Sequence, residues 1–307
     1  MKAMLCSTVV AALVAVAGVN SALADNFKVH RYAAESWNVN SYWLESDSGI
    51  VLIDSLLLTT DANHLATLIE ATGKPLAAAI ITHDHTDHTG GLNTLIARLG
   101  SFPVIATQDT ADHFEGTHKR LSAWVKDDYD PAPPQATQIV EDGAQITLAG
   151  IDFVIDDIGP GEGENNILIY VPEANILFSG DATNHNHHVA GLRTGRAYEI
   201  LAQREYIKEK YGTVKKIYPG HGEPARPSAV LDAEIDYIEF RFELIEEALK
   251  SEENLDDDGT GLKEAVMEEM TGKVMARYKH LNDYGFDAVG LVNGSWPSLV
   301  KEVMAKN

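Results

Sequence analysis

The chain has 307 residues, enough for one large α/β domain or two ordinary ones, and 45% of its residues are hydrophobic, as is typical of a globular protein. Its formal net charge is -22 at pH 7. A surface this acidic repels nucleic acid and anionic membranes, so we exclude both as partners.

Residues 1–24, MKAMLCSTVVAALVAVAGVNSALA, predict a secretory signal peptide that is cleaved near Ala24. Lys2 provides a charged start, an apolar run follows, and Ala22 and Ala24 form an A-x-A-like end. The only cysteine, Cys6, lies within this segment, so the mature chain would contain no disulfide. We therefore expect a secreted, periplasmic protein without stable membrane insertion, as a monomer or a homodimer.

Apolar runs between polar or glycine breaks predict strands, and apolar residues at helical spacing predict helices. The predicted strands cover residues 27–32, 39–46, 49–55, 76–82, 103–107, 137–140, 144–148, 152–157, 166–172, 175–181 and 215–219. The predicted helices cover residues 58–72, 89–99 and 194–211, with a helix or a loop up to about residue 127. The first three strands suit an antiparallel meander. This order of elements predicts an α/β fold with two sheets and helices on their outer faces.

From about residue 226 the chain becomes helical, with apolar residues at helical spacing on an acidic background. Two more helices are expected beyond the polar stretch NLDDDGTG. We interpret residues 25–225 as the main domain and residues 226–307 as a helical extension packed on that same domain.

The strongest functional signal is ITHDHTDHTGG, in which His83, His85, Asp87 and His88 directly follow a buried strand. Four ligand-type side chains in one loop at the carboxyl end of a strand can converge on metal with little ordering cost. A polar turn that caps a helix would explain Asp87, but it would not explain three histidines.

These residues resemble the signature of the metallo-β-lactamase superfamily, His-x-His-x-Asp-His after a strand. Further landmarks recur in the same order: NSYWLE, VLIDS with Asp54, LFSGDA with Asp181, and YPGHGEP with His221. The resemblance covers roughly residues 27–250. It implies a four-layer αββα sandwich followed by C-terminal helices, with a dinuclear site, usually zinc, at one edge of the two sheets.

The resemblance also implies a set of ligands, carried over by position. The first metal would be bound by His83 and His85, the second by Asp87, His88 and His221, and Asp181 would bridge the two. Imidazoles and carboxylates suit two Zn²⁺ ions, although Mn²⁺ or iron would also be tolerated. Asp54 resembles the family's buried aspartate, to which we assign an orienting role.

The family's third histidine on the first metal falls on Glu162, within GPGEGENN. Three interpretations stand: Glu162 is a ligand, the first metal site is crippled, or a neighbour such as Glu164 binds instead. The nineteen residues from Glu162 to Asp181 match the spacing in histidine-bearing relatives. The alkylsulfatase branch of the superfamily also resembles this chain in carrying a glutamate here, so we favour Glu162 as a ligand.

The stretch DATNHNHHVAGLRTGR follows the bridging aspartate and is expected to lie across the mouth of the site. We predict that His185 is catalytic, as a proton donor to the leaving group. Asn184, His187, His188 and Arg193 are the predicted substrate-binding residues. Arg193 and Arg196 could hold an anionic group, or they could pair with surface acids.

The sequence thus predicts a metal-dependent hydrolase in which a metal-bridging hydroxide, with Asp87 and Asp181 as catalytic ligands, attacks an ester-type bond. A lactone, a thioester or a sulfate ester is the expected substrate, with water as co-substrate. The alternatives are a β-lactam hydrolase of an atypical branch and a non-catalytic metal-binding periplasmic protein. Asp181 occupies a position that is commonly cysteine in β-lactam-hydrolysing relatives, which argues against the main zinc β-lactamase types and leaves an atypical branch as the first alternative.

Overall fold

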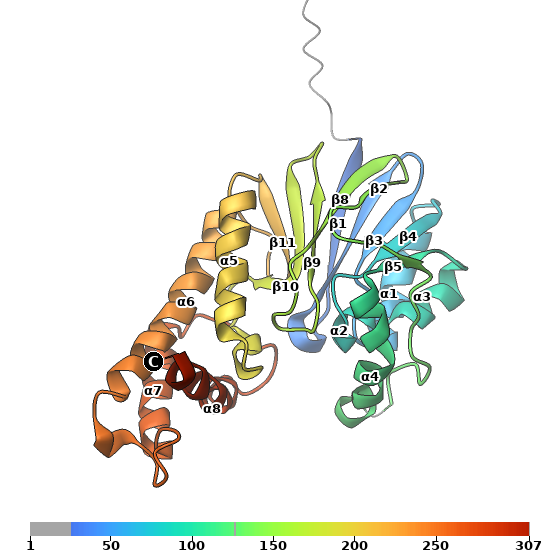
Figure 1. Ribbon diagram of the computed structural model, residues 1–307. Helices are drawn as coiled ribbons and strands as arrows, with labels where there is room; N and C mark the ends of the chain where they lie inside the picture. The colour runs from blue at the N-terminus through green and yellow to red at the C-terminus, as the bar shows by residue number, and fades with distance from the viewer. Residues whose placement is uncertain (1–25, 126, 307) are drawn as a thin grey trace, which may run out of the picture.

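The structure, a computed structural model, describes residues 26–125 and 127–306 (Figure 1). The predicted signal peptide lies outside the described residues. The chain forms two sheets that face one another, as predicted. One sheet contains β1 (Phe27–Ala33), β2 (Asn40–Ser46), β3 (Ile50–Ile53), β4 (Leu76–Ile80), β5 (Val104–Ala106) and β6 (Gln138–Ile139), in that order. The other contains β11 (Lys216–His221), β10 (Ile176–Asn184), β9 (Ile167–Val171), β8 (Ile151–Asp157) and β7 (Gln145–Leu148), in that order.

Helices cover the outer faces of both sheets and continue into the C-terminal part (Figure 1). The α-helices are α1 (Thr59–Glu70), α2 (Thr86–Thr89), α3 (Leu92–Leu99), α4 (Gln108–Trp124), α5 (Ala197–Tyr211), α6 (Pro227–Ala248), α7 (Glu264–Arg277) and α8 (Ala288–Lys306). Short 3-10 turns are η1 (Ser36–Asn38), η2 (Ala190–Arg193) and η3 (Glu252–Asn254). The αββα sandwich with C-terminal helices is therefore confirmed.

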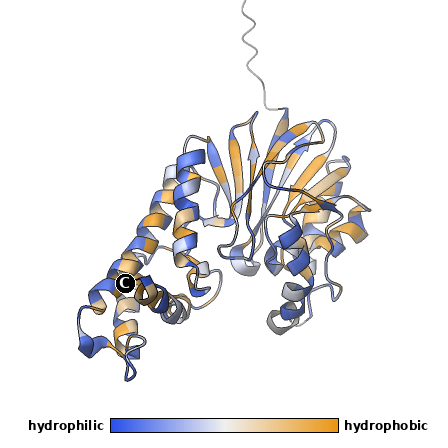
Figure 2. Cartoon of the chain, viewed as in Figure 1, coloured by the Kyte–Doolittle hydropathy of each residue, from blue (hydrophilic) through white to orange (hydrophobic). Residues whose placement is uncertain are grey.

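Apolar side chains from both sheets meet in a central core. Leu44, Ile53 and Ile80 from the first sheet cluster with Phe153 and Phe178 from the second. Figure 2 shows hydrophobic residues along the strands of both sheets and mixed hydrophobic and hydrophilic residues along the helices. This pattern follows from geometry, because strands buried on both faces need apolar side chains on both, whereas a surface helix buries one stripe.

The helix predicted at 89–99 begins later, at Leu92 of α3, and Gly90 and Gly91 separate it from the short α2. A Cβ atom on Gly90 would overlap the carbonyl oxygen of Leu57, and one on Gly91 would overlap that of Ser55. Only glycine allows the backbone to come this close to these carbonyl oxygens. The histidine-rich loop therefore packs directly against the residues that follow β3.

The C-terminal helices pack on the turn that follows β10 and on the start of α5. Leu192 and Ile200 join Ile238, Trp296 and Leu299 in one buried cluster. In Figure 1, α6 lies beside α5, and α8 lies near the foot of both. The extension therefore contacts the part of the chain that leads away from β10. No helix within the described ranges is both long and apolar enough to span a membrane.

Candidate metal centre

The candidate ligands lie where strands of both sheets end at one edge. β3 and β4 run parallel, as do β10 and β11, so their carboxyl ends lie at the same side of their sheets. The two sheets are joined there by a hydrogen bond from the Ile167 N–H to the Thr82 carbonyl (3.0 Å) and by a bridge between Val39 and His221. The loop after β4, the end of β10 and the end of β11 therefore lie together at this edge.

Six of the seven predicted metal ligands form two groups that share Asp181. In each group the potential ligand atoms lie within 4.8 Å of one another. One group contains His83, His85 and Asp181, and the other contains Asp87, His88, Asp181 and His221. All six are buried except His85, which is partly exposed.

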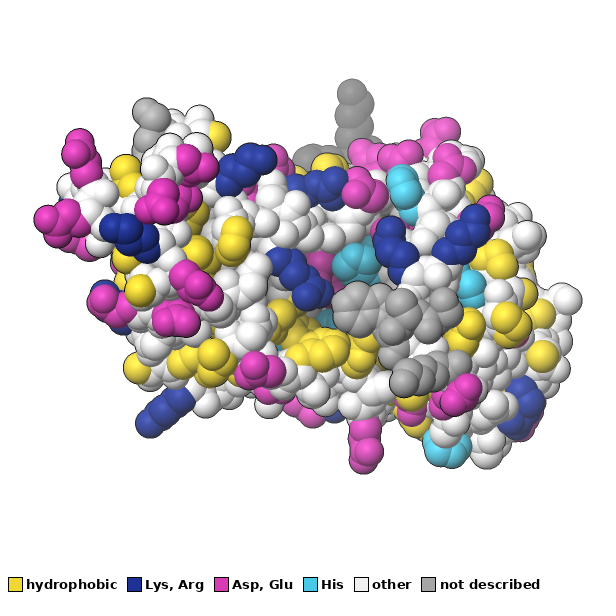
Figure 3. Space-filling model, turned by 90° about the horizontal axis from the view of Figure 1, so that it is seen from below, with side chains coloured by type: hydrophobic (Ala, Val, Ile, Leu, Met, Phe, Trp, Pro, Cys, Tyr) yellow, Lys and Arg dark blue, Asp and Glu magenta, His cyan; other side chains and the backbone are white. Residues whose placement is uncertain are grey.

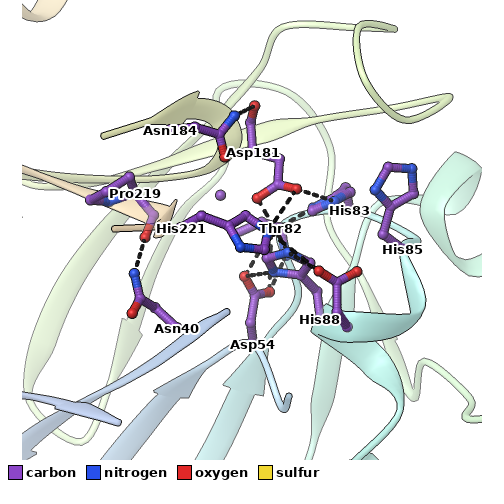
Figure 4. A network of polar contacts seen from close by, with 12 residues as sticks. Asn40, Asp54, Thr82, His83, His85, His88, Asp181, Asn184, Pro219 and His221 are labelled. Atoms are coloured by element: carbon purple, nitrogen blue, oxygen red, sulfur yellow. Dashed lines mark hydrogen bonds and ion pairs between the residues drawn. The ribbon is translucent and has the colours of Figure 1, made fainter. Parts of the chain in front are cut away.

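The carboxylate of Asp181 lies between the imidazoles (Figure 4). Its Oδ1 lies 3.2 Å from Nε2 of His88. Its Oδ2 lies 3.3 Å from Nε2 of His221 and 3.7 Å from Nε2 of His83. Asp87 adds an oxygen 3.3 Å from the same atom of His221. The arrangement suits a carboxylate shared between two cations.

Three imidazoles are oriented through their other ring nitrogen. Nδ1 of His88 bonds to Asp54 at 2.8 Å, and Nδ1 of His221 bonds to the Trp37 carbonyl at 2.9 Å. Nδ1 of His83 lies 2.9 Å from the hydroxyl of Thr82, which donates to Asp54. If each Nδ1 carries the proton, each Nε2 is left as a lone-pair ligand. The orienting role predicted for Asp54 is confirmed.

Burial and mutual charge shift the pKa of these groups strongly. Burial opposes ionisation of Asp87 and Asp181, but the neighbouring histidines hold the pKa of both carboxyls below its usual range. Burial also disfavours a charged His221, yet Asp181 and Asp87 raise its pKa to about 10. The same carboxylates raise the pKa of His88 against the effect of burial. The cluster therefore favours positive charge between its carboxylates, which two dications would supply.

Several buried polar atoms in this cluster lack a hydrogen-bond partner in the described structure. They are Nε2 of His83, Nε2 of His88, Oδ1 of Asp181 and Oε2 of Glu162. Such atoms are costly unless something satisfies them. A mixed imidazole and carboxylate set with unsatisfied lone pairs fits zinc and related dications.

Glu162 lies in the loop between β8 and β9 and lines the same pocket as His85, Asp181 and His221. It belongs to neither group of ligand atoms among the described residues. Burial and the charge of Asp181 raise its pKa. Glu164, the alternative ligand, instead forms an exposed ion pair with Arg196 at 2.6 Å. The ligand role of Glu162 stays a prediction, whereas the position of Glu164 gives no support to the alternative.

The loop after β10 does not lie across the mouth as a whole. His185 bonds through Nδ1 to the Glu223 carbonyl (2.7 Å) and lines a separate cavity with His187. His187 packs against His221, with ring centroids 6.1 Å apart, and His188 bonds to the Tyr237 hydroxyl. These histidines do not line the main pocket. Ala190 and Arg193 of the same stretch do line it, and the catalytic or substrate-binding roles of the three histidines stay predictions.

Asn184 and Arg193, the other two predicted substrate-binding residues, differ in their surroundings. Asn184 is buried, its backbone N–H donates to Glu234, and its side-chain amide donates to the Asp181 carbonyl at 3.4 Å. Arg204 donates to the same Glu234 and to the same carbonyl oxygen. Asn184 therefore helps to hold the end of β10. Arg193 lines the main pocket.

The main pocket has a volume of about 490 Å³ and opens beside the candidate ligands. Figure 3 shows a hollow on this face with histidine and acidic side chains inside it and Lys or Arg and hydrophobic side chains around it. The lining residues that the sequence did not single out include Trp37, Arg120, Tyr284, Phe286 and Leu291. The only local signal is the aromatic pair around Gly285, and nothing in its spacing points to the pocket.

Residues 35–221 match the sequence model of the Metallo-beta-lactamase superfamily. Metallo-beta-lactamase IND-1 of Chryseobacterium indologenes is 23% identical over 62% of this chain and 75% of its own length. The Alkyl/aryl-sulfatase BDS1 of Saccharomyces cerevisiae is 27% identical over 49% of this chain and 29% of its own length. The Hydroxyacylglutathione hydrolase of Bdellovibrio bacteriovorus is 28% identical over 52% of each chain. This chain thus spans about half or less of the length of the latter two relatives.

Solved structures support the same fold. The metallo-beta-lactamase from Pontibacter korlensis has a TM-score of 0.56 and 19% identity, covering 71% of this chain and 96% of its own. The structure of metallo-beta-lactamase IND-7 has a TM-score of 0.57 and 20% identity, covering 70% of this chain and 94% of its own. The uncovered part of this chain is large enough to contain the C-terminal helices.

Proposed function

Because this chain belongs to the metallo-β-lactamase superfamily of metal-dependent hydrolases, we propose that it uses two zinc ions to hydrolyse an ester-type bond in an anionic substrate. The observation that carries this proposal is the position of Asp181. Its carboxylate oxygens face the imidazole of His83 in one ligand group and those of His88 and His221 in the other, which is the arrangement a bridging ligand requires.

The first ion would be held by His83, His85 and Asp181, with Glu162 as the fourth protein ligand. The second ion would be held by Asp87, His88, His221 and the same Asp181. When bound, a pair of such ions polarises a substrate oxygen and makes water nucleophilic near neutral pH. A ligand set with three carboxylates would also tolerate Mn²⁺ or iron.

The residues of the chain itself would bind and orient the substrate. In the described part of the chain the guanidinium of Arg193 forms no ion pair, and it lines the pocket that opens on the ligands. Arg120 contributes a second positive charge to the same pocket. Arginine is well suited to carboxylate, phosphate or sulfate oxygens, because its donors are planar and can bond in pairs. A substrate anion would therefore lie between these two side chains and the ligand cluster.

Lactones, thioesters and sulfate esters all fit this description, and we propose the sulfate ester as the preferred class. Two features support it. The arginines would hold a sulfate group, and the relatives of this chain include the Alkyl/aryl-sulfatase BDS1. Hydrolysis of a β-lactam remains a second candidate, since the relatives include metallo-beta-lactamase IND-1.

Metal analysis and a substrate panel test this proposal. The protein should bind two equivalents of zinc and hydrolyse at least one of a sulfate ester, a lactone and a thioester faster than a β-lactam. Chelation should remove both metal and turnover, and zinc should restore them. One equivalent of metal or none, with no turnover on any of these substrates, would show a non-catalytic metal-binding protein instead. We also propose, from the signal-like residues 1–24 alone, that the protein acts in the periplasm.

A further inference from the structure

The segment of residues 282–291, which follows α7 and enters α8, is joined to the loop after β10. The Asn282 N–H donates to the Asn186 carbonyl at 2.8 Å, and the His188 N–H donates to the Asn282 carbonyl at 3.0 Å. The Tyr284 hydroxyl donates to the His188 carbonyl at 2.7 Å. These three bonds fix a part of the C-terminal extension beside the metal centre.

Tyr284 brings the segment into contact with the candidate ligands. Its ring centroid lies 4.8 Å from that of His221 and 4.8 Å from that of His187. Tyr284 and Gly285 have positive φ angles of 61° and 80°, so the chain reverses sharply after the buried tyrosine. Phe286, two residues later, is 43% exposed and lines the pocket.

Phe286 meets an aromatic residue from the opposite end of the chain. Its ring centroid lies 5.4 Å from that of Trp37 in η1. The carbonyl of Trp37 accepts a hydrogen bond from His221, so the Trp37 and Phe286 pair is connected to the ligand cluster. Leu291, in the first turn of α8, adds an aliphatic side chain to the same pocket. Phe286, Leu291 and Trp37 therefore give this side of the pocket an apolar surface, next to Asp287, which also lines the pocket.

The same extension also positions the cationic side of the pocket. The Ser298 hydroxyl of α8 donates to the Arg193 carbonyl at 3.0 Å, and Glu302 accepts a hydrogen bond from the Ala197 N–H at 2.8 Å. The extension thus contributes an apolar wall directly and supports Arg193 indirectly. A substrate that contacts both Arg193 and the apolar residues must carry an anionic group and an apolar group.

We propose that Phe286, Leu291 and Trp37 determine specificity by contacting the apolar group of the substrate, so that the C-terminal extension forms part of the active-site pocket. These residues act on binding and leave the chemical step to the metal centre. The inference rests on the proposed hydrolase function, but its binding test does not require turnover. Phe286 and Leu291 lie beyond residues 35–221, the part of the chain that matches the family, whereas Trp37 lies within it.

The kinetic test compares butyl, hexyl and octyl esters of the class that the enzyme hydrolyses. We expect kcat/KM to rise about twofold per added methylene, because full burial would give about fourfold and this wall is half open. Phe286→Ala and Leu291→Ala should flatten that rise and lower kcat/KM for the octyl ester about tenfold, through KM rather than kcat. Val289→Ala is the matched control, since Val289 is 52% exposed on the same helix and does not line the pocket.

The binding test uses butane-, hexane- and octanesulfonate with the zinc-loaded protein, measured by titration calorimetry. Affinity should rise with chain length in the wild type and in Val289→Ala, and the rise should be lost in Phe286→Ala. Chain-length-dependent binding without turnover of any ester would support the wall and reject the proposed hydrolysis. Turnover with no dependence on chain length, or an unchanged dependence in both pocket variants, would overturn the inference alone.

Discussion

Asp54 accepts a hydrogen bond from Nδ1 of His88 at 2.8 Å, and the same carboxylate accepts a hydrogen bond from the Thr82 hydroxyl beside His83. Asp54 itself has a positive φ angle of 59° at the end of β3. One buried carboxylate thus orients an imidazole from each of the two ligand groups. Such partners fix the orientation of the ligating rings and make them better ligands.

Asp54→Asn should weaken zinc binding about 10- to 100-fold, because the amide would orient the two imidazoles less well than the carboxylate. Competition with a chromophoric chelator would measure the affinity of each variant. Asp47→Asn alters an exposed carboxylate in the turn between β2 and β3, so it should leave the zinc affinity unchanged. Equal affinities in the two variants would contradict the orienting role.

Glu162→Ala should remove the metal held by His83 and His85, whereas Glu162→His should keep two equivalents and shift substrate preference. The reason is that alanine deletes the fourth ligand and histidine replaces it with a neutral one. Metal content after dialysis would be measured by atomic emission. Glu164→Gln serves as the control, because Glu164 pairs with Arg196 at the surface. Two full equivalents in the alanine variant would rule out Glu162 as a ligand.

Most of the fold could be predicted from the sequence, because its elements have clear local patterns. The strands before His83 and Asp181 are continuous apolar runs, and the two sheets bury them. Part of the metal centre could be predicted for a related reason: the candidate ligands of the loop after β4 are close in sequence, so their convergence needs little tertiary information. Asp181 and His221 are distant in sequence, and only the resemblance to the superfamily pointed to them.

The wall of the pocket could not be predicted in this way. Phe286 reaches Trp37 only because α8 packs on η2 and α7 leads back toward β10, and no local pattern encodes that route. The direction of the His185 side chain could not be predicted either. His185 is close in sequence to Asp181, but its Nδ1 bonds to the Glu223 carbonyl, and its catalytic role stays a prediction.

Arg193→Met should raise KM for a sulfate ester about 30-fold and change kcat little, since a hydrogen bond between charged groups contributes about 1.5–3 kcal/mol. Steady-state kinetics would measure the effect. Arg196→Met is the matched control, because the Arg196 guanidinium already binds Glu164 and the Gly163 carbonyl. A similar loss in both variants would indicate a general effect of surface charge rather than anion binding by Arg193.

Gly220→Ala should abolish binding of at least one metal while the protein still folds. A Cβ atom at Gly220 would overlap Oδ1 of Asp181 and lie 3.0 Å from Cε1 of His88, so the shared carboxylate would have to move. Gly272→Ala in α7 is the control, since a Cβ atom there meets nothing within 4 Å and alanine favours the helix. Metal content and circular dichroism would separate the two outcomes. Two tightly bound ions in the Gly220→Ala variant would show that Asp181 is not held as described.

His188 should make the protein lose stability as the pH falls from about 6.5 toward 4. Burial and, to a smaller extent, the charge of Arg241 lower its pKa to about 4, while Asp283 acts in the opposite sense. Because the folded pKa lies below the unfolded value of 6.5, the unfolded chain takes up the proton first as the pH falls. The resulting loss of unfolding free energy is absent above pH 6.5 and grows below it. Between pH 7.5 and pH 5 this difference amounts to at most about 2 kcal/mol. Urea denaturation of chelator-treated protein should therefore show a smaller loss of unfolding free energy in His188→Gln than in the wild type. Equal losses in the two proteins would mean that His188 is protonated in the folded state.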